Sequence, residues 1–140
     1  MTWNIITIPV EGDIKEANLS FEEIARYLGD GERAIVERVT TPYLHFLAHL
    51  EYNPETREGG DRYPSVVMLV DENFLITKTE SEYKYNKRAQ VFYPHAPILG
   101  NVVLVGEDEV EDEIEFASLP NIVTIDRVEK YIEQRLAKFN

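Results

Sequence analysis

Two short, uniformly apolar segments constrain the fold of this chain more than any other feature. One runs from Val66 to Val70 and the other from Val102 to Val105. A strand with one face in water alternates apolar and polar residues, whereas a strand that is covered on both faces is apolar throughout. The two segments therefore predict central strands of a sheet that has other structure packed against each face.

The segments before these strands carry signals for further elements. The β-branched stretch from Trp3 to Val10 predicts a first strand, and residues 34–39 predict another. Between them, Ser20 and Glu23 have the spacing of a capping box, and Gly29 supplies a stop signal. We therefore expect a helix over residues 20–29, close to the N-terminus.

The stretch from Tyr43 to Tyr52 alternates in a way that is typical of a strand. Leu44, Phe46 and Leu50 would point to one side and the residues between them to the other. Residues 53–64 are polar and rich in turn formers, so they predict a long, mobile hairpin loop that returns the chain to the first apolar strand.

A second amphipathic helix is predicted at the end of the chain, over residues 126–139. Asp126 and Glu129 have capping-box spacing, and an apolar stripe follows through Val128, Tyr131, Ile132, Leu136 and Phe139. The chain has 140 residues and 44% hydrophobic composition without an internal repeat or a linker, which fits a single domain over residues 1–140. We expect an α+β fold whose mixed or mainly antiparallel sheet carries an N-terminal and a C-terminal helix.

Composition also bears on where the protein resides. The absence of cysteine excludes disulfides and thiolate metal sites, as suits a reducing compartment. The first ten residues lack the basic start of a signal peptide, and no apolar run approaches the roughly 18 residues of a membrane span. We expect a soluble, cytoplasmic protein that has no contact with a membrane.

Residues 106–115 are the most unusual segment, because seven of the ten are carboxylates: Glu107, Asp108, Glu109, Glu111, Asp112, Glu113 and Glu115. The formal net charge of the chain is -12, which disfavours direct binding to nucleic acid because cations supply most of that affinity. Calcium binding is disfavoured, because the tract lacks the spacing and the glycine turn of a calcium-binding loop. Two other interpretations stay open. The tract is either a solvated hairpin or edge strand whose Val110, Ile114 and Phe116 pack inward, or a display of carboxylates that binds a basic protein surface.

The usual signatures of catalysis are missing from the sequence. On a strand, His45 and His49 would lie ~13 Å apart at ~3.3 Å per residue, too far to hold one metal ion, so we interpret them as surface or hairpin-packing side chains. No serine has a glycine-flanked setting, and Gly59-Gly60 lacks the Lys-Ser or Lys-Thr of a phosphate-binding loop. Together with Glu51, the histidines are conceivable acid–base groups without other support. We expect a protein that is not an enzyme and that uses no metal or cofactor.

Cations and aromatic residues interleave in the segment 83–93 of this otherwise acidic chain. The residues of interest are Tyr83, Lys84, Tyr85, Lys87 and Arg88. Such a combination can stack a base and hold a phosphate, which would suit a nucleotide or small-molecule binder. It is also the pattern of a short helix whose aromatics enter the core while its cations offset nearby acid, and we favour this interpretation.

The sequence Asn86-Lys87-Arg88-Ala89, followed by the strand from Ile98 to Gly106, resembles a small domain family of unknown function. The family is common in bacteriophages, plasmids and bacterial genomes. The segment Val67–Glu72, the Ser118-Leu119 step and the Phe21–Ile24 helix start are also similar. The resemblance implies an α+β fold and mobile-element ancestry, and it supplies no catalytic residues. Compared with the family's compact core, residues 43–63 look like an enlarged hairpin.

The acidic tract and the missing catalytic signatures together predict a non-enzymatic accessory protein, encoded by a phage or a related element. It would bind a host protein that has a basic surface, and it would thereby inhibit a defence or nucleic-acid-processing factor. The alternative is a small-molecule or nucleotide-binding protein that uses the segment 83–93.

Overall fold

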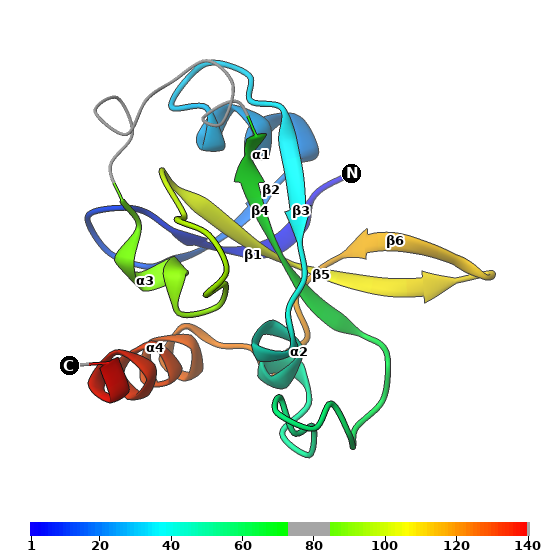
Figure 1. Ribbon diagram of the computed structural model, residues 1–140. Coiled ribbons are helices and arrows are strands. Elements are labelled where there is room, and N and C mark those ends of the chain that lie inside the picture. The colour runs from blue at the N-terminus through cyan, green and yellow to red at the C-terminus, as the bar shows by residue number, and fades with distance from the viewer. Residues whose placement is uncertain (73–84, 140) are drawn as a thin grey trace.

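The computed structural model describes residues 1–72 and 85–139 (Figure 1). No helix in these ranges has the length and apolar content needed to cross a lipid bilayer. The elements follow one another along the chain as β1 (Trp3–Ile8), β2 (Lys15–Leu19), α1 (Phe21–Leu28), β3 (Val36–Val39), α2 (Pro42–Ala48), β4 (Ser65–Asp71), α3 (Lys87–Gln90), β5 (Val102–Val110), β6 (Glu113–Ala117) and α4 (Ile125–Phe139).

Within the described residues, the strands form one antiparallel sheet of six strands, which confirms the α+β class. Five of them lie in the order β2-β1-β5-β4-β3, and β6 pairs with β5 outside this path. The first half of β5 lies between β1 and β4, so that Leu104 is opposite both Ile6 and Met68. The second half of β5 pairs with β6 in a hairpin that projects from the rest of the sheet (Figure 1).

Both central strands are covered on two faces, as their apolar sequences predict. Every residue from Val66 to Val70 and from Val102 to Val105 is at most 3% exposed. Met68 and Leu104 belong to the core that lies under α2, α3 and α4. Val67 and Val103 face the opposite way and pack against α1. The sheet therefore forms the middle layer, with helices on each side of it.

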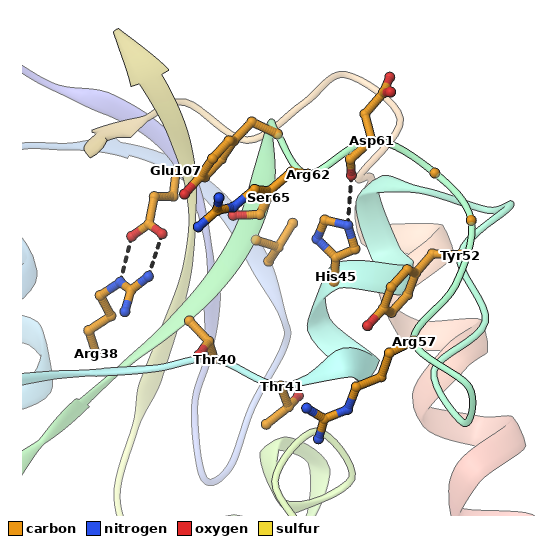
Figure 2. Close-up of a pocket in the computed structure, with 14 residues that line it drawn as sticks. Arg38, Thr40, Thr41, His45, Tyr52, Arg57, Asp61, Arg62, Ser65 and Glu107 are labelled. Carbon is orange, nitrogen blue, oxygen red and sulfur yellow. Dashed lines mark hydrogen bonds and ion pairs between the residues drawn. The ribbon is translucent and has the colours of Figure 1, made fainter. Parts of the chain in front are cut away.

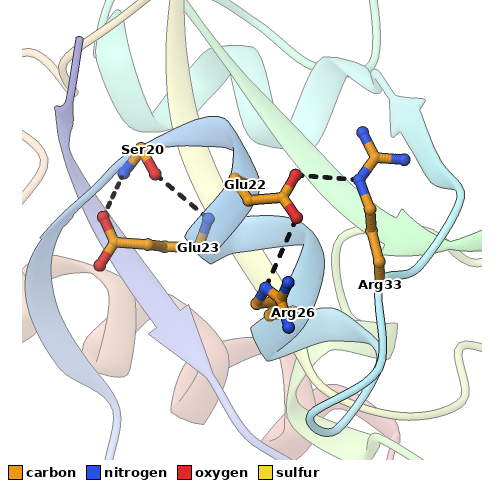
Figure 3. A network of polar contacts seen from close by, with 5 residues as sticks. All are labelled: Ser20, Glu22, Glu23, Arg26 and Arg33. Atoms are coloured by element: carbon orange, nitrogen blue, oxygen red, sulfur yellow. Dashed lines mark hydrogen bonds and ion pairs between the residues drawn. The ribbon is translucent and has the colours of Figure 1, made fainter.

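Helix α1 begins where the capping box predicts it (Figure 3). The hydroxyl of Ser20 accepts a hydrogen bond from the backbone N–H of Glu23 at 3.2 Å, and the Glu23 carboxylate accepts one from the N–H of Ser20 at 3.0 Å. On the exposed side of the helix, Glu22 pairs with both Arg26 and Arg33. The pKa of Glu22 is lowered, chiefly by the hydrogen bond from Arg33.

The predicted N-terminal helix is not the first element of the chain, because the strands β1 and β2 both precede α1. No sequence signal predicts β2. This strand lies at the edge of the sheet beside β1, and four of its side chains are polar or small: Lys15, Glu16, Ala17 and Asn18. A strand of this kind lacks the apolar signal by which strands are found in a sequence.

The strand predicted for residues 43–52 is wrong, since Pro42–Ala48 form the helix α2. Thr41 begins this helix. Its hydroxyl accepts a hydrogen bond from the N–H of Leu44 at 3.3 Å and donates one to the carbonyl of Phe92 at 2.7 Å. The predicted hairpin loop of residues 53–64 consequently joins a helix to β4 and does not connect two strands.

Helix α4 has the predicted extent to within one residue, but another residue caps it. The hydroxyl of Thr124 accepts a hydrogen bond from the N–H of Arg127 at 3.2 Å. Asp126, the predicted cap, lies in the first turn and pairs with Lys130. The ring of Tyr131 stacks on Phe92 with 5.3 Å between ring centroids, and burial raises the pKa of Tyr131 to about 12.

Candidate functional site

The carboxylates of the acidic tract lie on the β5–β6 hairpin, and we call residues 108–115 the acidic arm. Its two strands are joined by a turn of two residues, Glu111 and Asp112, whose φ angles of 51° and 65° are both left-handed. This is the geometry of a type I′ turn, which favours Asn-Gly. Figure 1 shows the arm extending away from α3 and α4. The backbone thus holds the tract in a defined hairpin outside the main body of the sheet.

Glu107, at the base of the arm, differs from the other predicted partner-binding residues. Its side chain is 5% exposed, and both of its oxygens accept hydrogen bonds from the guanidinium of Arg38. The bond to Glu107 raises the pKa of Arg38. Because Arg38 lies on β3 and Glu107 on β5, the pair spans β4, the strand between them. Glu107 therefore has a structural contact and is not part of the exposed arm.

The other six predicted residues do present their carboxylates on the surface. Asp108 is half-buried and the remaining five are exposed. Among the described residues, none of the six takes part in an ion pair. Val110 and Ile114 are 48% and 51% exposed, so the prediction that they pack inward is wrong, whereas Phe116 does pack against Trp3. The arm therefore carries unpaired negative charge beside exposed apolar side chains.

The structure separates the residues of the alternative ligand site. Tyr83 and Lys84 lie outside the described residues. Tyr85 and Lys87 line a cavity of about 590 Å³ together with residues 94–97. Arg88 is engaged elsewhere, because its guanidinium donates a hydrogen bond to the carbonyl of Pro9 at 2.6 Å. The segment also contains the predicted short helix, α3.

The Asn86-Lys87-Arg88-Ala89 motif has a clear structural role at Asn86, which is fully buried. The Nδ2 group of Asn86 donates hydrogen bonds to the carbonyl of Ile8 at 3.0 Å and to that of Gly100 at 2.9 Å. Its Oδ1 atom accepts one from the N–H of Ala89 at 3.0 Å and so caps α3. One side chain thus ties together the end of β1, the start of α3 and the loop before β5.

A polar cavity of about 420 Å³, which the sequence analysis did not predict, lies beside the base of the arm. We call it the arginine cavity, because Arg38, Arg57 and Arg62 all line it (Figure 2). Its hydroxyl groups come from Thr40, Thr41, Tyr52, Tyr63 and Ser65. These residues come from the end of β3, from the start of α2 and from the loop before β4. No short motif contains them, so a sequence pattern could not have revealed the cavity.

The loop of residues 53–64 is held by its own polar contacts. Asn53 donates its N–H to the carbonyl of Glu58 at 2.8 Å, and its side chain accepts a hydrogen bond from the N–H of Glu55 at 2.9 Å. Gly59 has a φ of 89°, and a Cβ atom there would collide with the carbonyl of Glu51. Glycine lets the loop approach the end of α2 this closely, which gives the cavity a fixed wall.

His45 and His49 attach the same loop to α2. The Nε2 atom of His45 lies 2.9 Å from the carbonyl of Asp61, and that of His49 lies 2.6 Å from the carbonyl of Pro64. Their rings are 4.6 Å apart between centroids, because residues four apart are neighbours on a helix and not on the predicted strand. The described residues contain no group of three or more metal-ligating side chains. The two histidines therefore hold the loop against α2 and do not pack within a two-stranded hairpin.

Acidification should destabilise the protein through His45. Burial lowers the pKa of His45 in the folded state, and the neighbouring His49 acts in the same direction. Between that lowered value and the unfolded pKa of about 6.5, the unfolded chain binds more protons, so stability falls as pH falls through this window. Urea denaturation at several pH values from 7 down to 5 should show this slope, and His45→Gln should flatten it. His95→Gln, which removes an exposed imidazole elsewhere, should leave the slope in place; equal flattening would contradict the assignment.

Comparison of the chain with protein-family models, with curated proteins and with solved structures found no match. The resemblance to the phage, plasmid and bacterial domain family therefore stays a prediction.

Proposed function

We propose that the protein is a non-enzymatic accessory protein that binds another protein through its acidic arm. The observation that carries the proposal is the arm itself, a projecting hairpin whose exposed carboxylates have no cationic partner among the described residues. Like charges at this density repel one another, and a cationic surface would relieve that repulsion. The expected partner is a protein with a basic patch.

Two further features of the arm support a protein partner over a purely solubilising role. Val110 and Ile114 remain about half exposed within the charged hairpin, and interfaces combine such apolar contacts with charge that selects the partner. The turn residues Glu111 and Asp112 have left-handed backbone conformations, which side chains other than glycine adopt at a cost. The chain thus has two carboxylates at a turn where a different pair of residues would be more stable.

The chemistry of the arm suggests what binding would do. Proteins that process nucleic acid carry basic surfaces that neutralise phosphate. A projecting hairpin that carries several carboxylates can occupy such a surface and exclude the phosphate backbone from it. We propose on this basis that the protein inhibits a defence or nucleic-acid-processing factor of the host, as an accessory protein of a phage or a related mobile element.

Reversing charge on the arm should weaken capture of the partner by at least about tenfold, because like charges placed together at an interface cost several kcal/mol. The variant Glu109→Lys/Glu113→Lys changes two exposed carboxylates and leaves the Glu107–Arg38 pair in place. Immobilised protein is exposed to host-cell extract, and the captured proteins are identified and quantified by mass spectrometry. The amount of the specific partner should also fall steeply as salt increases.

The matched control is Glu129→Lys/Glu133→Lys, which reverses two exposed carboxylates on α4 and gives the same net charge. A partner that is captured by the wild type and by the α4 variant, but not by the arm variant, supports the proposal. Capture that falls equally in both variants would show a response to overall charge. Capture that persists in the arm variant would exclude the arm as the contact surface.

A second candidate function is binding of a nucleotide or small molecule in the cavity lined by Tyr85 and Lys87. The supporting observation is the cavity of about 590 Å³, whose remaining wall is formed by Gln90, Val91, Leu136 and the loop that contains His95. A ligand that binds the native state raises the melting temperature by mass action. A nucleotide-induced rise that Lys87→Gln abolishes would support this function, and a rise that the variant retains would exclude the cavity.

A further inference from the structure

We propose that the arginine cavity binds the phosphate group of a small phosphorylated molecule. The cavity concentrates cations in a chain whose formal net charge is -12. Three of the residues that line it are arginines: Arg38, Arg57 and Arg62. Such a cluster is unusual in an acidic protein, and it places positive groups around a polar pocket that is open to solvent.

The positive charge of the cavity is not fully neutralised by the nearby carboxylates, because one of them is paired with Arg38 and the other points away. Glu107 is held by Arg38, so these two residues neutralise each other. Figure 2 shows the carboxylate of Asp61 pointing away from the cavity, while its backbone carbonyl contacts His45. Among the described residues, neither Arg57 nor Arg62 takes part in an ion pair. The cavity is therefore net positive.

The loop that carries Arg57 and Arg62 has a defined backbone conformation and contacts of its own. Arg57 has a φ of 61°, a left-handed conformation that is uncommon for a side chain other than glycine and often marks a functional position. In Figure 2 its guanidinium extends from the loop toward Thr41. The guanidinium of Arg62 lies 5.4 Å from the centroid of the Tyr63 ring, in a cation–π contact. The loop that carries both is anchored by His45 and His49.

The donor set of the cavity suits a phosphate. Guanidinium groups present paired N–H donors that fit two oxygens of a phosphate, and Arg57 and Arg62 together with the surrounding hydroxyls can meet several oxygens at once. A volume of about 420 Å³ lies within the range of small-molecule sites. Tyr52 and Tyr63 add aromatic surface for the organic part of the ligand. The proposal concerns residues outside the acidic arm and stands independently of the proposed function.

Titration with inorganic pyrophosphate, against sodium chloride of equal ionic strength, tests the site. The melting temperature of the wild type should rise with pyrophosphate concentration as mass action requires, and it should not rise with chloride. In the variant Arg57→Gln/Arg62→Gln, the pyrophosphate concentration needed for the same rise should increase by at least about tenfold. Arg26→Gln/Arg33→Gln removes two exposed arginines near α1 and should respond like the wild type.

A second measurement on the wild-type protein does not depend on how the variants fold. NMR signals of the arginine Nε–Hε groups should move for Arg57 and Arg62 when pyrophosphate is added, and the signal of Arg33 should stay in place. Selective movement supports the site. Equal movement of all arginine signals, or equal thermal shifts in the two double variants, would overturn the proposal in favour of general ion binding.

Discussion

Replacing Asn86 with aspartate should destabilise the protein by about 3 kcal/mol or more, because one buried and one partly buried carbonyl lose their donor. The Nδ2 group of Asn86 serves the carbonyls of both Ile8 and Gly100. A carboxylate keeps the acceptor that caps α3 at Ala89, so the loss comes from the missing donors and from a negative charge placed between two oxygens. The free energy of unfolding, measured by urea denaturation at pH 7, gives the size of the effect.

The pH dependence of this variant provides a second check. Burial beside carbonyl oxygens raises the pKa of an aspartate, so the penalty begins at the unfolded value of about 3.9 and grows as pH rises above it. The stability difference between Asn86→Asp and the wild type should therefore shrink as pH falls toward 4. Asn101→Asp is the matched control, because Asn101 accepts the hydrogen bond from Val10 with Oδ1, which an aspartate retains. Equal losses in the two variants would contradict the role assigned to Asn86.

Gly106→Ala should lower the free energy of unfolding by about 3 kcal/mol, because the new methyl group meets backbone on the other strand of the hairpin. This is the upper end of the usual cost of adding volume to a packed core. A Cβ atom there would lie 2.8 Å from the carbonyl oxygen of Ala117 and closer still to that of Ser118. A flexible side chain could move aside, but these carbonyls are fixed. The N–H of Asn4 donates to the hydroxyl of Ser118, and the carbonyl of Asn4 accepts from Leu119.

Hydrogen exchange and chemical denaturation check this prediction together. Amides of β6 should exchange faster in Gly106→Ala, because the hairpin cannot keep its register without displacing the strand. Capture of the partner should weaken as well, although every carboxylate of the arm is unchanged. Ile114→Ala, which trims an exposed side chain on the same hairpin, should change stability by less than about 1 kcal/mol. If Gly106→Ala proved as stable as Ile114→Ala, the carbonyls of Ala117 and Ser118 would have moved aside at little cost, and the prediction would be wrong.

The elements that could be predicted from the sequence are those whose signals are local. The apolar run of β4 and the capping box of α1 are each recognisable from a few consecutive residues. Helix α2 was missed because its alternating apolar residues mimic a strand. The better signal was Thr41-Pro42, an N-cap followed by the residue that most favours the first helical position. Thr41 and Pro42 were thus a better guide to the secondary structure than the alternation over residues 43–52.

The candidate sites show the same division between local and distant signals. The charge of the arm is visible in consecutive residues, whereas its turn at Glu111 and Asp112 lacks the Asn-Gly signal and was not located from the sequence. That Glu107 would be buried could not be predicted, since its partner Arg38 lies on another strand. The arginine cavity depends wholly on tertiary structure, because α2 had to be a helix before His45 and His49 could hold the loop against it.

At the tip of the hairpin, the residues that would give the most stable turn differ from the residues that carry the negative charge. Asn-Gly is the sequence that a type I′ turn accommodates best, whereas this chain has Glu111 and Asp112 there. Selection for a higher melting temperature, in nature or in the laboratory, would favour Asn-Gly early and would remove two carboxylates from the outermost point of the molecule. A thermostable homologue that has Asn-Gly at these positions and keeps its function would show that the two carboxylates at the tip are dispensable.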